Sequence, residues 1–265
     1  MKQTFIAPDW LLTRRLRVLL VGCGGTGSHL ADGLASLNVT LVKLGHPGFD
    51  VTLADHDRVS PHNLGRQRFA APDVGHNKAL LLQHRINLFY GLDWNAHPHR
   101  VSPGEASRLD VLITATDSAL FRAAVGKHFR RRATHALWLD HGNGASTGQV
   151  ILGHLSGTSS TDGLRLPNVF DLYPELADMA AADREAPSCS TEEAIQRQEW
   201  PINRAMAQAG LTILWNLFRA GELQSHGALV DTRSLHVSPM PIDPEAWAFW
   251  GYAQSTRKKR TRKAA

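Results

Sequence analysis

Residues with the types and spacing of a ligand-binding site gather in the first half of the chain. The first group is the glycine-rich segment Gly22-Cys23-Gly24-Gly25-Thr26-Gly27-Ser28. Glycines at this spacing allow a tight turn between a strand and a helix, and they let the backbone approach a phosphate closely. N–H groups exposed at the helix start favour an anion. The segment therefore predicts a nucleotide-binding turn, although NAD- and ATP-binding folds share the pattern.

Acidic and basic residues follow the second expected strand. Asp55, at the end of that strand, can accept hydrogen bonds from both hydroxyls of a ribose, which fits either nucleotide. Arg66, Arg68 and Lys78 come next. Each of these residues alone could be a solvated surface charge. Grouped around a glycine turn they can neutralise a triphosphate, and each charge-assisted hydrogen bond contributes roughly 1.5–3 kcal/mol. A hydride-transfer site does not need so much positive charge, so the group favours ATP.

Asp117 follows the apolar run 110–115, which predicts another buried strand. Because the carboxyl ends of parallel strands converge, we expect Asp117 in the same cleft as the glycine-rich segment. A carboxylate facing a triphosphate is repelled unless a cation lies between them. We therefore predict that Asp117 binds Mg²⁺, with capping of the following helix as the alternative.

The chain contains two cysteines, which exclude a four-cysteine zinc site within one chain. Cys189 precedes a helical stretch, where a thiol can have a lowered pKa and act as a nucleophile. The alternative is a small buried residue. Cys23 is a poorer candidate because it lies in the phosphate-binding turn. His97 and His99 face the same side of an expected strand, but with no third ligand apparent we interpret them as exposed polar residues.

The elements that must position these residues alternate between strands and helices. Apolar runs predict strands over 16–21, 51–55, 110–115 and 136–140, and helical spacing predicts helices over 26–37, 77–89 and 120–131. This alternation predicts an α/β fold, a Rossmann-like doubly wound, mainly parallel sheet with helices on both faces. Residues 38–50 contain Gly45-His46-Pro47-Gly48 and predict a long connection that could reshape the nucleotide side of the pocket.

We predict four parts along the chain. They are an ATP-binding domain over 1–155, a long mobile loop over 156–190, a C-terminal extension of the same domain over 191–250, and a basic disordered tail over 251–265. The extension should contain a helix over 202–220 and a β-hairpin over 228–237. The tail carries six positive charges, so the rest of the chain is close to neutral within the formal net charge of +5, and contact with nucleic acid or an acidic partner is the alternative to disorder.

No apolar run approaches the roughly 18 residues that a membrane span needs, and no secretory signal is apparent at the start. We therefore expect a soluble cytoplasmic protein with no membrane partner.

Several of these features occur together and in order. They are the glycine-rich segment, Asp55-x-Asp57-x-Val59, Asn63-Leu64-x-Arg66-Gln67, Lys78 and Asp117. In this combination they resemble the adenylation domain of the ThiF/MoeB/HesA family, which is related to ubiquitin-activating enzymes. The likeness covers about residues 16–152. The whole chain is most similar to the ThiF-related proteins of the PRTRC plasmid cassette, but the paired Cys-x-x-Cys zinc motifs of many relatives are absent.

The resemblance implies a reaction in which ATP and the C-terminal carboxylate of a small ubiquitin-like (β-grasp) protein give an acyl-adenylate and pyrophosphate. Thioester formation could follow. Family members are commonly homodimers, in which an N-terminal arginine of one subunit reaches the ATP of the other. Arg14 or Arg15 could play that part.

By motif position, Asp55 would hold the ribose, Asn63, Arg66 and Lys78 the phosphates, and Asp117 the magnesium ion. The predicted catalytic residues are Arg66, Lys78, Asp117 and Cys189. The residues predicted to bind the cofactor are Gly22, Gly24, Gly25, Gly27, Ser28, Asp55, Asp57, Asn63, Arg66, Gln67 and Lys78.

Three other functions use some of the same residues. A nicotinamide-dependent oxidoreductase would use the glycine turn and Asp55 but leaves residues 63–78 unexplained. A non-catalytic ATP-binding scaffold of a plasmid-associated complex would account for the basic tail. A tRNA-modifying dehydratase of the same superfamily would use ATP to activate a small carboxylate.

Overall fold

The computed structural model describes residues 1–158, 164–179 and 198–252. Within these ranges the chain forms an eight-stranded central sheet and a separate pair of short strands. The strands are β1 (Phe5–Ile6), β2 (Leu16–Val21), β3 (Phe49–Ala54), β4 (Asn95–His97), β5 (Val111–Thr114), β6 (Leu137–Asn143), β7 (Thr147–His154), β8 (Glu222–Leu223), β9 (Ser225–Asp231) and β10 (His236–Pro241). The α-helices are α1 (Asp9–Thr13), α2 (Gly25–Lys43), α3 (Lys78–Tyr90), α4 (Ala119–Phe129), α5 (Val169–Leu172), α8 (Ile202–Ala220) and α9 (Pro244–Phe249). Short 3-10 helices are η1 (Pro61–Asn63), η2 (Ala71–Asp73) and η3 (Pro103–Arg108).

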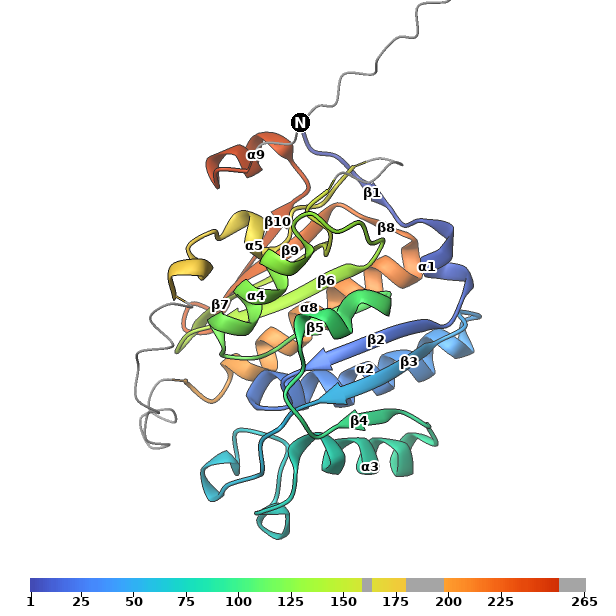
Figure 1. Ribbon diagram of the computed structural model, residues 1–265, viewed down its shortest axis with the longest axis vertical. Coiled ribbons are helices and arrows are strands. Elements are labelled where there is room, and N and C mark those ends of the chain that lie inside the picture. The colour runs from blue at the N-terminus through green and yellow to red at the C-terminus, as the bar shows by residue number, and fades with distance from the viewer. Residues whose placement is uncertain (159–163, 180–197, 253–265) are drawn as a thin grey trace, which may run out of the picture.

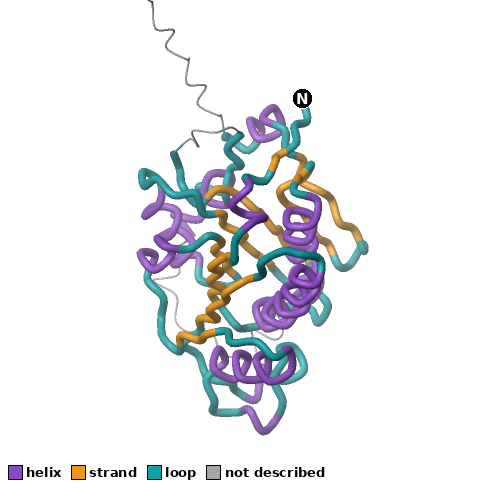
Figure 2. Tube along the Cα trace, turned by 90° about the vertical axis from the view of Figure 1, so that its right-hand side faces the viewer, coloured by secondary structure: helices purple, strands orange, loops and turns teal. Residues whose placement is uncertain are grey.

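The central sheet has the strand order β10-β9-β7-β6-β5-β2-β3-β4. Strands β6, β5, β2, β3 and β4 run parallel, whereas β7, β9 and β10 pair in antiparallel fashion. Helices α2 and α8 cover one face and α4 lies on the other (Figure 1). Figure 2 shows the strands in the middle with helices on both sides. The predicted Rossmann-like α/β fold is confirmed.

The chain reverses its direction of winding between β2 and β5. The connections through α2 and α3 lead from β2 outward to β3 and β4, and the chain then returns through η3 to β5 on the other side of β2. Loops that leave adjacent strands toward opposite faces open a crevice at the carboxyl edge of the sheet. The apolar sequence of β5 suits its place in the middle of the sheet, where the strand is buried at every position.

The long connection predicted over residues 38–50 is wrong. Helix α2 continues to Lys43 and β3 begins at Phe49, so only five residues join them. Asn38 does not break the helix because its side-chain oxygen accepts a hydrogen bond of 2.7 Å from the N–H of Phe49. The turn itself uses positive φ angles at Gly45 and Gly48.

The C-terminal helix and hairpin complete the same sheet. Strand β9 pairs with β7, so residues on both sides of the expected boundary at 155 share one sheet. Helix α8 spans the range predicted for it and packs closely on α2. A side-chain carbon at Gly33 would lie 2.2 Å from Leu211. Glycine at position 33 therefore permits this contact.

Part of the segment predicted as a long mobile loop is packed in the core. Leu166, Val169 and Leu172 are buried, and the Asn168 side chain caps α5. Local polar caps, rather than a periodic apolar pattern, organise this stretch, so hydrophobic periodicity could not predict it. Residues 180–197 and the predicted basic tail beyond residue 252 lie outside the described residues.

None of the helices in the described ranges combines the length and the apolar character needed to cross a membrane.

Buried histidines connect the outer strands to the rest of the core. The Nδ1 atom of His226 on β9 lies 2.9 Å from the carbonyl oxygen of Leu152, and its Nε2 accepts a hydrogen bond of 3.0 Å from the indole of Trp247. A neutral imidazole satisfies both contacts, but a protonated one could not accept from Trp247. Burial lowers the pKa of His226 to about 4, and it does the same for His141 and His154.

These histidines predict a loss of stability in mild acid. Their pKa values are about 4 in the folded chain against 6.5 for the ordinary side chain, so the unfolded chain takes up protons first as the pH falls from 6.5. The free energy of unfolding should then fall by as much as about 1.4 kcal/mol per pH unit for each histidine. Urea unfolding followed by tryptophan fluorescence between about pH 7.5 and 4.5 measures this slope.

The matched variants for this experiment are His226→Gln and His84→Gln, since His84 is exposed on α3. The slope should be shallower in His226→Gln and unchanged in His84→Gln. A free energy of unfolding that stays constant across this pH window contradicts the assignment.

Candidate nucleotide-binding site

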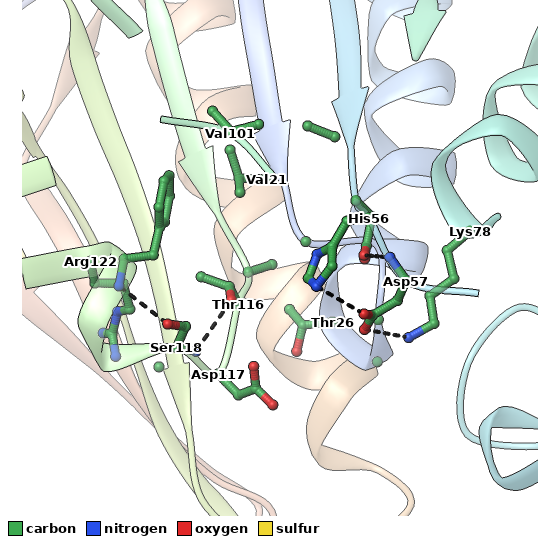
Figure 3. Close-up of a pocket in the computed structure, with 18 of the residues that line it drawn as sticks. Val21, Thr26, His56, Asp57, Lys78, Val101, Thr116, Asp117, Ser118 and Arg122 are labelled. Carbon is green, nitrogen blue, oxygen red and sulfur yellow. Dashed lines mark hydrogen bonds and ion pairs between the residues drawn. The ribbon is translucent and has the colours of Figure 1, made fainter. Parts of the chain in front are cut away.

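A pocket of about 980 Å³ lies at the carboxyl edge of the parallel strands, where the winding direction reverses. The residues that directly follow three neighbouring strands line it: Gly22 after β2, Asp55 after β3 and Ala115 after β5. In Figure 3, His56, Asp57 and Lys78 stand on one wall, and Asp117, Ser118 and Arg122 stand on the other. The pocket therefore occupies the crevice that this topology opens.

The glycine turn forms the floor of the pocket. A side-chain carbon at Gly27 would lie 1.8 Å from the carbonyl oxygen of Gly22, and one at Gly22 would lie 2.6 Å from the carbonyl oxygen of Ala115. Gly22 also has a φ of +92°. Helix α2 begins at Gly25 without a side-chain cap, so the N–H groups of its first turn are available to an anion.

Asp55 ties the glycine turn to the loop after β3. Its Oδ2 accepts a hydrogen bond of 2.7 Å from the N–H of Cys23, and its Oδ1 accepts one of 2.9 Å from the N–H of Asp57. Burial raises the pKa of Asp55, and these N–H bonds act in the opposite direction. Each carboxylate oxygen keeps a further lone pair, so Asp55 can still accept a hydrogen bond from a ligand hydroxyl.

Lys78 is buried at the first position of α3, and its Nζ lies 3.3 Å from Oδ2 of Asp57. The neighbouring Asn77 fixes this helix start. Its Oδ1 accepts from the N–H of Leu80, and its Nδ2 donates to the carbonyl oxygens of Asp55 and Asp57 at 2.9 and 3.1 Å. The capping residue therefore also places the lysine against the loop after β3.

Arg66 lines the same pocket and comes from the segment between η1 and η2. Its Nη1 donates a hydrogen bond of 2.7 Å to Oε1 of Gln198. Gln198 precedes α8, so this contact joins two parts of the chain that lie far apart in sequence.

The carboxylate of Asp117 stands on the opposite wall and is exposed. Ser118, not Asp117, caps α4, because its Oγ accepts a hydrogen bond of 3.2 Å from the N–H of Phe121. The alternative role of Asp117 as a helix cap is therefore wrong. Asp117 makes no hydrogen bond or ion pair with any described residue, which leaves both of its oxygens available to a ligand or a cation.

A buried polar network holds the wall that carries Asp117. Asp140 on β6 accepts hydrogen bonds from Nε of Arg122 at 2.9 Å and from the hydroxyl of Thr114 at 2.5 Å. The indole of Trp138 donates to that same hydroxyl at 2.8 Å. Although burial acts to lower the pKa of Arg122, the Asp140 carboxylate raises it overall, so the ion pair is maintained. The network fixes α4 to the end of β5 and to the middle of β6.

Helix α8 supplies a further wall that the sequence did not indicate. Oδ1 of Asn203 accepts a hydrogen bond of 3.2 Å from the hydroxyl of Thr26, next to the glycine turn. Nδ2 of Asn203 and Oε1 of Gln67 are buried, line the pocket, and have no hydrogen-bond partner among the described residues. Both atoms are therefore available to a water molecule or a polar ligand in the pocket. Asn203 follows Thr26 by 177 residues, so no local pattern could identify it.

Most of the predicted site residues meet in this pocket. Those that line it are Gly22, Gly24, Gly25, Asp55, Asp57, Arg66, Gln67, Lys78 and Asp117. Gly27 lies just beneath the turn. Ser28 and Asn63 face elsewhere: the Ser28 hydroxyl contacts the backbone of Gly25 and Arg68, and the Asn63 side chain accepts from the N–H of Ser60 within η1. Cys189 lies outside the described residues.

Arg14 and Arg15 precede β2 and therefore lie at the edge of the sheet opposite the pocket. Arg14 binds Asp110 at 2.5 Å, and Arg15 binds Asp93 at 3.1 Å. Either arginine would have to leave its own carboxylate to reach the site of a second subunit.

A nucleoside triphosphate and a magnesium ion fit this set of groups. The helix start and the two basic side chains suit phosphates, and the unpaired atoms of Gln67 and Asn203 suit polar groups of a ligand. Asp117 offers the hard oxygen ligand that Mg²⁺ requires.

Comparisons with known proteins identify the family and the fold of the chain. The model of the ThiF family matches residues 4–244. The ATP-dependent ubiquitin transferase-like protein Cap2 of Pseudomonas aeruginosa (strain BWHPSA011 / Pa011) is 35% identical over 100 residues, which are 37% of this chain and 18% of Cap2.

Solved structures show the same fold at low sequence identity. The structure of E. coli MccB with ATP has a TM-score of 0.58 at 15% identity and covers 88% of this chain and 65% of MccB. PaaA has a TM-score of 0.55 at 16% identity and covers 86% of this chain and 64% of PaaA. The chain thus spans just under two thirds of these two proteins and less than a fifth of Cap2.

The contact between Gly27 and Gly22 predicts that Gly27→Ala loses nucleotide binding. The added carbon would overlap the carbonyl oxygen of Gly22, so the first turn of α2 must move away from the glycine turn. We expect the affinity for Mg²⁺-ATP, measured by calorimetry, to fall by at least about tenfold, because the N–H groups that face the phosphates are displaced.

The matched control for this variant is Gly104→Ala in η3, where the nearest atom would lie 4.0 Å from the added carbon. This control should bind the nucleotide as the parent chain does. Wild-type affinity in Gly27→Ala would contradict the role given to the glycine turn.

Proposed function

Because the chain belongs to the ThiF family, we propose that it is an ATP-dependent adenylyltransferase that activates a carboxylate of a protein substrate. The observation that carries the proposal is the convergence of the glycine turn, the basic side chains Arg66 and Lys78, and Asp117 around one pocket. The name of Cap2 supports this proposal. So do the structures of MccB with ATP and of MccB with AMPCPP and MccA.

The proposed reaction forms one bond and breaks another. A carboxylate oxygen of the substrate attacks the α-phosphorus of ATP, and the bond from that phosphorus to the bridging oxygen of the β-phosphate breaks. Pyrophosphate leaves with the electron pair, and an acyl-adenylate remains. No proton transfer is needed in this step. The protein therefore acts by holding the reactants and balancing the charge on the phosphates.

Different residues of the pocket bind the phosphates, the ribose and the magnesium ion in this proposal. The N–H groups at the start of α2 and the side chains of Arg66 and Lys78 bind the phosphates, and Asp55 accepts hydrogen bonds from the ribose. Asp117 would hold Mg²⁺, which when bound neutralises negative charge on the phosphate oxygens. The network of Arg122 and Asp140 keeps the Asp117 wall in place.

We further propose that the substrate is the C-terminal carboxylate of a small ubiquitin-like protein of the β-grasp class. The ubiquitin transferase-like name of Cap2 supports this class of partner. The proposal extends to a homodimer, the form that the family resemblance implies.

Removal of the basic side chains tests the proposal. Arg66→Ala and Lys78→Ala should each reduce substrate-dependent exchange between ATP and pyrophosphate by at least about tenfold, since each removes a charge-assisted hydrogen bond to a phosphate. The controls are Arg219→Ala and Lys43→Ala, which remove exposed charges at the ends of α8 and α2. Circular dichroism should show the same fold in all four variants.

Full exchange in both Arg66→Ala and Lys78→Ala would remove their assigned role. Binding of ATP by the parent chain without exchange, across a set of candidate small proteins that end in glycine, would favour the non-catalytic scaffold instead. Preference for NAD over ATP would favour the oxidoreductase.

We propose that the activated carboxyl passes to Cys189 as a thioester. The chain has two cysteines, and Cys23 is fully buried in the glycine turn, where burial raises the pKa of its thiol well above the ordinary value. Such a thiol is a poor nucleophile at neutral pH. Cys189 is therefore the remaining candidate nucleophile of this chain.

The thioester predicts a covalent conjugate with the substrate protein that reducing agents cleave. Incubation with ATP and the substrate, followed by non-reducing electrophoresis, should show the conjugate in the parent chain and not in Cys189→Ser. Pyrophosphate exchange should persist in Cys189→Ser because adenylation precedes the transfer. A conjugate that forms equally well in Cys189→Ser would exclude this cysteine.

A further inference from the structure

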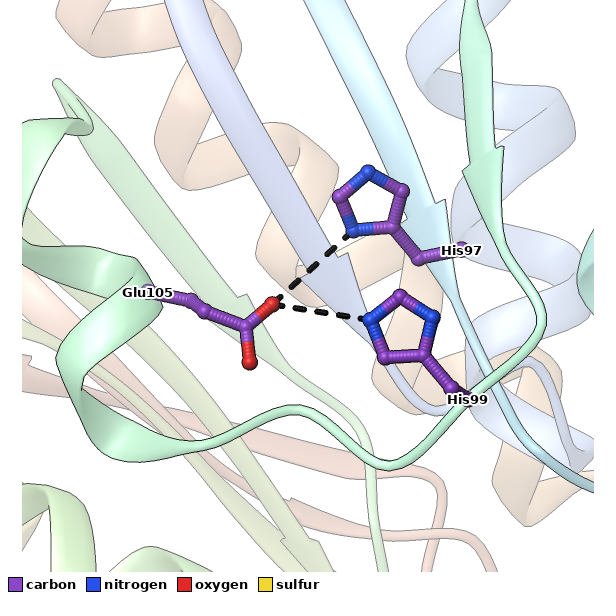
Figure 4. A group of neighbouring side chains, drawn as sticks. All are labelled: His97, His99 and Glu105. Atoms are coloured by element: carbon purple, nitrogen blue, oxygen red, sulfur yellow. Dashed lines mark ion pairs between the residues drawn. The ribbon is translucent and has the colours of Figure 1, made fainter.

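Three metal-ligating side chains meet beside the nucleotide pocket. His97 is the last residue of β4, His99 follows two residues later, and Glu105 lies in η3. Figure 4 shows the Glu105 carboxylate facing both imidazole rings, which stack with their centroids 5.0 Å apart. No third ligand was apparent from the sequence, and the fold supplies one because η3 turns back over the end of β4.

The distances between these groups are those of ion pairs and are longer than hydrogen bonds. Oε2 of Glu105 lies 3.7 Å from Nε2 of His99 and 4.0 Å from Nδ1 of His97. Both separations exceed a normal hydrogen bond. Two ligand atoms on one tetrahedral zinc ion are roughly 3.4 Å apart. All three ligand atoms lie within 4.8 Å of one another, so small side-chain rotations can bring them onto one ion.

A helix cap orients Glu105, and a backbone hydrogen bond fixes the position of His97. Oε1 of Glu105 accepts a hydrogen bond of 2.7 Å from the N–H of Ser102, which leaves Oε2 directed at the rings. The carbonyl oxygen of His97 accepts one of 3.1 Å from the N–H of Asp55, so the end of β4 is fixed to the end of β3. Nδ1 of His97 is buried and has no hydrogen-bond partner among the described residues.

We propose that His97, His99 and Glu105 bind one divalent transition-metal ion of the Zn²⁺ class and leave a fourth position to water or to a ligand. Two imidazoles and a carboxylate suit zinc, copper or nickel, whereas Mg²⁺ prefers oxygen ligands only. The ion would therefore differ from the magnesium ion assigned to Asp117, and the site does not depend on the proposed adenylyltransferase activity.

The position of the site gives the ion a structural effect on the pocket. His99, Arg100 and Val101 line the pocket, and they belong to the segment that joins β4 to η3. An ion bound at both ends of this segment would fasten that wall of the pocket to the end of β4.

Cobalt spectroscopy on the nucleotide-free full chain, prepared without a histidine tag and stripped with a chelator, tests the site. Titration with Co²⁺ should give visible absorption that saturates at one equivalent and disappears when Zn²⁺ is added. Glu105→Gln and His99→Gln should each weaken binding by at least about tenfold. The matched control is His236→Gln, since His236 is exposed on β10, and it should bind as the parent chain does.

A second measurement separates loss of the site from loss of the fold. Zn²⁺ added in slight excess over one equivalent should raise the melting temperature of the parent chain and of His236→Gln. It should not raise the melting temperature of Glu105→Gln. Absence of stoichiometric binding overturns the proposal. So does equal binding by Glu105→Gln and the parent chain, or a near-ultraviolet thiolate band that places the cobalt on a cysteine.

Discussion

The rest of the site depends on the close approach of the first turn of α2 to the glycine turn that precedes it. A side chain at Gly27 would overlap the carbonyl oxygen of Gly22, and one at Gly22 would overlap the carbonyl oxygen of Ala115. The approach brings the N–H groups of the helix start to the carboxyl edge of the sheet, where Asp55 binds the N–H of Cys23. The pocket around that edge is lined by Arg66 and Lys78, which follow β3, and by Asp117, which follows β5. These two strands lie on either side of β2.

Local signals predicted β2, β5, β6, α3 and α4 to within about three residues, whereas α2 continues to Lys43 and not to Leu37 as expected. Apolar runs and helical spacing depend on near neighbours only, which explains the agreement for β2, α3 and α8. The topology rule for parallel strands likewise brought Asp55 and Asp117 to one pocket. Family membership is confirmed by the match over most of the chain. The closer likeness to the PRTRC proteins, and the predicted roles of Ser28 and Asn63 at the nucleotide, stay predictions.

Features that depend on distant partners could not be predicted. Asn38 continues α2 because its partner lies on β3, and Asn203 reaches the glycine turn from α8. Glu105 meets the two histidines only because η3 folds over β4. The sequence also left open whether Asp117 caps α4 or faces the pocket. Ser118 caps α4, which leaves the carboxylate of Asp117 available at the pocket.

The position of α8 determines when the pocket can be completed during translation. Asn203 contacts the glycine turn, yet it is synthesised long after that turn has left the ribosome. The central strands β2, β3 and β5 can associate early, whereas the pocket gains its last wall only when α8 docks on α2. The growing chain therefore carries the glycine turn, Lys78 and Asp117 well before the side chain that closes the pocket beside Thr26 has been synthesised.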